Sequence, residues 1–66
     1  MMKTYSFTIY QEGGDKFHTD DYPLARAKEI CLELKSTDAV YRINVHNDQD
    51  NYLEEITTTE LFDTNI

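Results

Sequence analysis

The chain is poor in the residues on which disulfide-bonded, metal-clustered and membrane-spanning proteins depend. Its 66 residues include one cysteine, one proline, two glycines and no tryptophan. The single cysteine, Cys31, excludes an intramolecular disulfide and any zinc cluster built on several cysteines. A chain without disulfides is typical of a reducing compartment. No apolar run approaches the ~20 residues of a transmembrane helix, and residues 1–6 lack the apolar block of a signal peptide. We therefore expect a cytoplasmic protein that makes no use of a membrane.

Positive charge is scarce at one end of the chain. Residues 43–66 contain six carboxylates and no lysine or arginine, whereas residues 1–42 are nearly balanced. Almost all of the formal net charge of −7 therefore belongs to the last third. Such an asymmetry bears on partners and solubility rather than on fold. Because phosphate contacts need clustered lysine and arginine, it disfavours direct binding to nucleic acid.

Small size limits what the chain can do alone. A chain of this length buries only about 60% of its unfolded surface and has room for one core. Such a core is too small to enclose a substrate cavity of several hundred cubic ångströms, so the sequence favours a binding module or a subunit over an enzyme. A hydrophobic content of 39% argues against disorder. We expect a single compact domain over residues 1–66, with the last few residues frayed.

Alternation of apolar and polar residues predicts four strands, over residues 3–11, 16–19, 39–46 and 52–58. Gly13 and Gly14 suit a tight turn between the first two, with Phe17 pointing inward on the return strand. Residues 47–51 form an all-polar turn before the fourth strand. Neither face of residues 52–58 is uniformly apolar, which is typical of an edge strand.

A helix is predicted from Pro23 to about Lys35, between the two pairs of strands. Asp20 and Asp21 are expected to stabilise the positive end of its dipole. Leu32 lies off the core stripe, either as a lone exposed leucine or as a partner or dimer contact. The expected stripe consists of Leu24, Ala27, Cys31 and Leu34, with Ile30 at its edge, and Leu61 and Phe62 are expected to cap the core.

These elements predict an α+β fold. The expected order is ββαββ, with a small antiparallel-rich four-stranded sheet and one helix packed on one face.

The sequence contains two weak candidates for chemistry. His46, Asp48 and Asp50 alternate in a way that suits a cation, but the calcium-loop pattern fails because Leu53 replaces its glycine and Thr59 its final glutamate. A solvated turn is the favoured interpretation. His18 and His46 are candidates for a distant acid–base pair, whereas Cys31 fits a small buried thiol better than a nucleophile. We therefore expect no catalytic residue, no metal and no cofactor.

The acidic end has two competing explanations. Its charge either keeps a marginal domain soluble and protects an exposed strand edge, or forms a surface that binds a basic protein. Tyrosine suits such an interface because its ring packs while its hydroxyl stays hydrated. The candidate partner-binding residues are Asp48, Asp50, Tyr52, Glu54, Glu55 and Glu60.

The plan of strands and helix from Thr4 to Phe62, the small size and the strong acidity resemble small phage-encoded inhibitor proteins, anti-CRISPR proteins among them. This resemblance implies inhibition by occupancy, in which the chain covers the nucleic-acid channel or an interface of a basic host protein in the host cytoplasm. It transfers no individual residue, because the resemblance lies in the overall plan. The alternative is a structural or accessory module that acts through homo-oligomerisation, as a possible homodimer.

Overall fold

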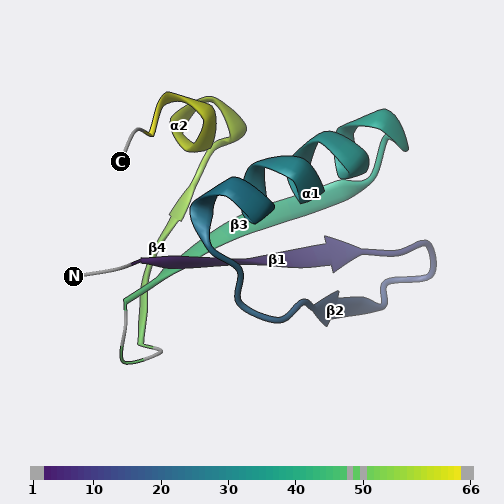
Figure 1. The fold of residues 1–66 in the computed structure, drawn as a ribbon. Coiled ribbons are helices and arrows are strands. Elements are labelled where there is room, and N and C mark those ends of the chain that lie inside the picture. Colours follow the sequence, from purple (N-terminus) through teal and green to yellow (C-terminus); the bar gives the residue numbers. More distant parts are fainter. Residues whose placement is uncertain (1–2, 48, 50, 65–66) are drawn as a thin grey trace.

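The computed structural model describes residues 3–47, 49 and 51–64, which form one four-stranded sheet and two helices (Figure 1). All neighbouring strands are antiparallel, and their order across the sheet is β2-β1-β3-β4. None of the helices in the described residues is long and apolar enough to cross a membrane. The elements are β1 (Thr4–Tyr10), β2 (Lys16–His18), α1 (Leu24–Ser36), β3 (Val40–His46), β4 (Tyr52–Ile56) and α2 (Thr58–Asp63).

The predicted α+β architecture is confirmed, with one addition. The expected fourth strand ends at Ile56, and the chain then forms a second helix, α2. Thr57 starts this helix because its side chain accepts a hydrogen bond from Glu60 N at 3.1 Å. The Glu60 carboxylate accepts in return from Thr57 N at 2.9 Å, which completes a capping box.

The core lies between the sheet and the two helices, which both cover the same face (Figure 1). The sheet contributes Phe7 and Ile43, and α2 contributes Leu61, all three almost fully buried. The predicted apolar stripe of α1 is confirmed at Leu24, Ala27 and Cys31, with Ile30 also in the buried core and Leu34 partly buried.

Two local expectations before α1 need correction. Phe17 lies opposite Ile9 and so shares the face of the sheet that packs against the core, as predicted, but it is 45% exposed because β2 is a three-residue strand at the edge of the sheet. Asp20 and Asp21 precede the N-cap, Pro23, and do not lie in the first turn of α1. Their segment instead follows the side of β1, where Tyr22 and Tyr5 exchange two backbone hydrogen bonds of 2.8 Å.

Candidate functional site

The structure places the predicted partner-binding residues of β4 on both faces of the sheet. In the β3–β4 register, Glu54 lies opposite Val45, a core residue, and therefore faces the helices. Glu55 and Tyr52 lie opposite Asn44 and His46 on the other face, which we call the open face. Asp48 and Asp50 fall outside the described residues.

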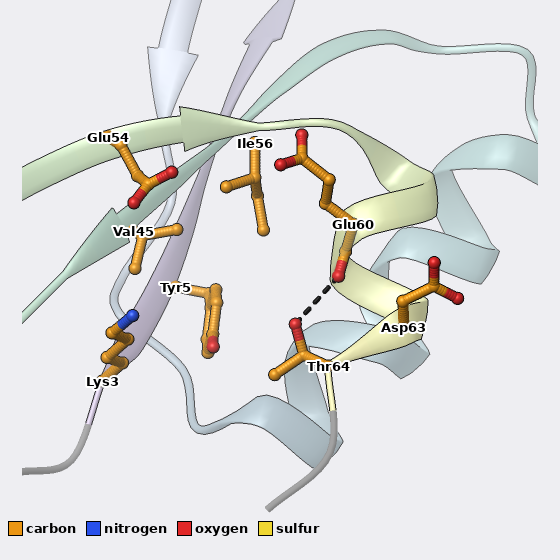
Figure 2. A pocket seen from close by; sticks show the side chains of 8 residues that line it. All are labelled: Lys3, Tyr5, Val45, Glu54, Ile56, Glu60, Asp63 and Thr64. Carbon is orange, nitrogen blue, oxygen red and sulfur yellow. Dashed lines mark hydrogen bonds between the residues drawn. The ribbon is translucent and has the colours of Figure 1, made fainter.

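On the helix side, Glu54 joins two carboxylates of α2. Glu54, Glu60 and Asp63 lie around a shallow depression of about 370 Å³ at the end of the sheet (Figure 2). Lys3 is the lysine that lines this depression. Glu60 also has a structural role, because its carboxylate caps α2. Asp63, which the sequence did not single out as a binding residue, lines the same depression from α2.

Strand β4 forms an exposed edge of the sheet. Residues 52–55 are all exposed, and Tyr52 and Leu53 retain 58% and 42% of their accessible surface. Glu55 lies 3.7 Å from Arg42 in an exposed ion pair, which contributes little to stability. The edge therefore combines carboxylates with two large apolar side chains.

The open face contains a second surface that the sequence did not predict. Ser6 and Thr8 are 6% and 5% exposed, although both lie on the side of the sheet away from the helices. The Ser6 hydroxyl bonds His46 Nε2 at 2.9 Å, and the Thr8 hydroxyl bonds His18 Nδ1 at 2.8 Å. Asn44 Nδ2 donates to Thr8 Oγ1 at 3.0 Å. These bonds satisfy the buried hydroxyls and fix the side chains that surround them.

These side chains line a groove of about 480 Å³ across the open face. Its floor comes from β1 and β3, one side from residues 18–21 and the other from β4. Among the described residues that line it are two carboxylates and no lysine or arginine. The lining residues are Ser6, Thr8, His18, Thr19, Asp20, Asp21, Asn44, His46 and Tyr52.

Ser6, His46 and Asp21 bear a superficial likeness to a hydrolytic triad. In such a triad the serine and the carboxylate contact different nitrogens of the histidine. Here Ser6 Oγ and Asp21 Oδ1 both approach Nε2, at 2.9 and 3.8 Å. The other nitrogen, Nδ1, is buried and has no hydrogen-bond partner in the described part of the chain. The carboxylate therefore does not orient the ring for base catalysis, and Ser6 itself is buried.

The two histidines of the expected acid–base pair line the same groove. Each contacts a different hydroxyl: His18 bonds Thr8 and His46 bonds Ser6. Because an unsatisfied buried N–H is costly, the geometry favours the His46 tautomer with its hydrogen on Nε2. The described residues contain no group of three or more histidine, cysteine or acidic side chains suited to a metal ion.

Cys31 lies in the core, as its place on the helix stripe predicted. Its sulfur is 3.4 Å from the Tyr41 hydroxyl and 3.9 Å from Thr58 Oγ1. Tyr41 and Thr58 are bonded to each other at 2.8 Å, so this polar cluster joins α1, β3 and α2. Burial, reinforced by the hydrogen bond with Cys31, raises the pKa of Tyr41 above its ordinary value. A thiol enclosed in this way is not accessible as a nucleophile.

Leu32 is confirmed as an outward residue of α1. It is 57% exposed and lies next to Glu33, which is also exposed. Isolated exposed leucines are common and need no functional explanation.

Comparisons with protein families, curated proteins and solved structures found no match.

Proposed function

We propose that this chain is a small acidic module that binds a basic protein and inhibits it by covering its nucleic-acid-binding surface. The observation that supports this most is the β4 edge, where Tyr52 and Leu53 are exposed beside Glu54 and Glu55. Proteins that bind phosphate backbones carry clustered lysine and arginine, which is the surface that such an edge complements.

The edge strand supplies two kinds of contact. Its outer backbone groups can pair with a strand of another protein, because β4 has a neighbour only on the β3 side in the described sheet. Tyr52 and Leu53 can fill apolar pockets of that partner. Together these contacts would provide affinity that charge alone does not give at an exposed surface.

The carboxylates determine which partner is accepted. Glu54 and Glu55 project from opposite faces of β4, so a basic partner meets a carboxylate on each side of the edge and would compete with Arg42 for Glu55. Opposite charges would speed association and disfavour acidic competitors. Two copies of this chain paired through β4 would bring the same carboxylates together, which disfavours a homodimer at this edge.

The proposal is tested by affinity capture from a bacterial lysate at low and high salt, with identification by mass spectrometry. The immobilised protein should retain basic nucleic-acid-binding proteins at low salt and release them as salt rises. Replacing Glu54 and Glu55 by glutamine should reduce this retention. The matched control replaces Glu12 and Asp15, two exposed acids of the β1–β2 turn, by glutamine and asparagine.

The control removes the same charge at the opposite edge of the sheet and should retain the same proteins. Retained proteins should also lose bound nucleic acid when this chain is added. Equal loss of retention in both double variants would attribute binding to net charge and contradict a role for β4. Retention that does not weaken at all as salt rises, or partners that are not basic, would contradict the proposal as a whole.

A further inference from the structure

We propose that β4 accepts an antiparallel strand of the basic partner, paired through the backbone of Glu55, and that this strand carries two consecutive basic residues. This inference rests on the proposed function, because the strand belongs to the partner that the chain would bind. It deepens that function by naming the backbone groups that pair and the kind of segment that they select.

Hydrogen bonds on both sides of β3 establish which way the backbone groups of each strand point. Tyr5 and Tyr22 exchange two backbone bonds, so the N–H and C=O of Tyr5 point away from β3. Because this direction alternates along an antiparallel strand, the even-numbered residues of β1 and β3 bond each other. The odd-numbered residues of β3 therefore point to β4. The bond of 3.0 Å from Asn47 N to Asn51 O continues this pattern just after β3.

The same alternation directs the backbone of Glu55 outward. Glu54 and Ile56 each lie opposite an odd-numbered residue of β3, so their N–H and C=O groups are used within the sheet. Glu55 lies between them and directs both groups to the other side, where β4 has no neighbour in the described sheet. One residue of an added antiparallel strand can exchange two hydrogen bonds with it. We specify an antiparallel strand because parallel pairing is less stable per residue.

The pairing site is short, because the chain closes both of its ends. Thr57 already uses its N–H to bond the Glu60 carboxylate and its C=O to accept from Leu61 N at 3.0 Å. Towards the start of β4, a shift of register opposite residues 45–46 interrupts the alternation. The hydrogen bonds to an added strand are therefore centred on Glu55.

The side chains beside this site select a basic segment. The partner residue paired with Glu55 shares the open face with it, with Cα atoms about 5.5 Å apart, and its neighbour lies beside Glu54 on the helix side. On the open face a basic side chain competes with Arg42, whose exposed contact with Glu55 is 3.7 Å long and weak. On the helix side, Glu54 lines the depression with two further carboxylates and Lys3, so negative charge exceeds positive charge there (Figure 2). Two consecutive basic residues therefore fit, one on each face.

The test is an NMR titration of the full chain with the peptide acetyl-Thr-Val-Lys-Arg-Val-Thr-amide. The peptide should slow the exchange of the Glu55 amide hydrogen with solvent in a saturable way. The amides of Glu54 and Ile56, already bonded to β3, serve as the internal reference. The same peptide N-methylated at its lysine loses the hydrogen that would bond Glu55 but keeps its charge, and should bind about tenfold more weakly. N-methylation at the arginine, whose N–H would point away from β4, should leave affinity within about twofold.

Two variants of the chain separate the backbone bond from the charge. Glu55→Gln removes the carboxylate and keeps the N–H, whereas Glu55→Pro removes both. Proline is tolerated on an edge strand where the N–H points to solvent, so the fold should be retained. The proline variant should bind the unmodified peptide about fivefold more weakly than the glutamine variant. If proline unfolds the chain, the methylated peptides still decide, because they need only the native protein.

Unchanged exchange of the Glu55 amide, equal effects of the two methylations, or equal affinities of a folded proline variant and the glutamine variant would each overturn the inference. The capture experiment separates it from the proposed function. If methylation at the lysine has no effect while the Glu54, Glu55 double variant loses basic proteins, the function stands and strand pairing falls. If that variant retains basic proteins as the native chain does, the proposed role of β4 falls whatever the peptides show.

Discussion

Two tyrosines on the helix-covered face of the sheet have hydroxyl groups whose pKa is raised by burial. Burial raises the pKa of Tyr5, and burial together with the Cys31 hydrogen bond raises the pKa of Tyr41. In both cases the uncharged phenol is favoured in the folded state. The consequence appears only at alkaline pH, because an ordinary tyrosine loses its proton near pH 10.

The first prediction concerns stability above that pH. Below about pH 10 both states keep the proton, so the free energy of unfolding should not depend on these groups. As pH rises past 10, the unfolded chain releases protons that the folded chain retains, and stability should fall. Tyr5→Phe should match the native chain at pH 8 and lose less stability at higher pH. Urea unfolding at pH 8 and above pH 10 measures this, and parallel losses in both proteins would contradict it.

At the level of elements, the stability of α2 depends on the capping box formed by Thr57 and Glu60, and a single substitution can test it. Thr57→Ala should lower the free energy of unfolding by about 1 kcal/mol, since it removes the acceptor for Glu60 N. Thr59→Ala, an exposed position within α2, is the matched control and should stay within about 0.5 kcal/mol of the native chain. Urea denaturation followed by circular dichroism compares the two, and equal losses would show that the cap is not the cause.

A second prediction at this scale concerns the side chain that α2 contributes to the core. Leu61 is fully buried, so Leu61→Ala should cost about 2–5 kcal/mol. A domain of this length has only about 3–10 kcal/mol in total, and the variant should be partly unfolded at room temperature. Leu32→Ala makes the same chemical change at a residue 57% exposed and should be almost neutral. A folded Leu61→Ala protein with native stability would show that α2 does not hold the core.

The same elements show which parts of the fold were predictable from sequence. Period-two alternation identified β1 and β3, and the apolar stripe identified α1, because each has one face that must be buried. The second helix was missed because threonine-rich residues 57–59 suit a strand equally well. The decisive signal was the spacing of Thr57 and Glu60, a threonine followed three residues later by a glutamate.

The groove on the open face could not be predicted in the same way. Alternation does place Ser6 and Thr8 on the side opposite Tyr5 and Phe7. What it does not give is the β1–β3 register, which brings Ser6 to His46 across 40 positions of sequence. Nor does it show that Asp20 and Asp21 leave the helix start and follow β1. These contacts depend on which distant segments pair in the sheet, and a local sequence pattern carries no information about that pairing.

At the scale of the whole molecule, the net charge opposes folding while favouring a basic partner. The formal charge of −7 produces repulsion that the compact state increases. Glu54, Glu60 and Asp63 line one depression between β4 and α2, with Lys3 also among its lining residues (Figure 2), and we expect part of that repulsion to arise there.

The last prediction concerns how salt changes the stability of the folded chain, because salt screens the repulsion between its carboxylates. Raising NaCl from about 0.01 to 1 M shortens the screening length from about 30 to 3 Å, so the thermal midpoint should rise. Glu54→Gln should be more stable than the native chain at low salt, and the difference should shrink as salt rises. Asp15→Asn, at an exposed turn near the opposite edge, should gain less. Scanning calorimetry of the native chain and the two variants measures these thermal midpoints. A native midpoint that falls as salt rises, or equal increases in midpoint for both variants at low salt, would show that the β4–α2 carboxylates do not repel one another. If Glu54→Gln is stabilised and also loses basic partners, the same carboxylate both costs stability and contributes to binding.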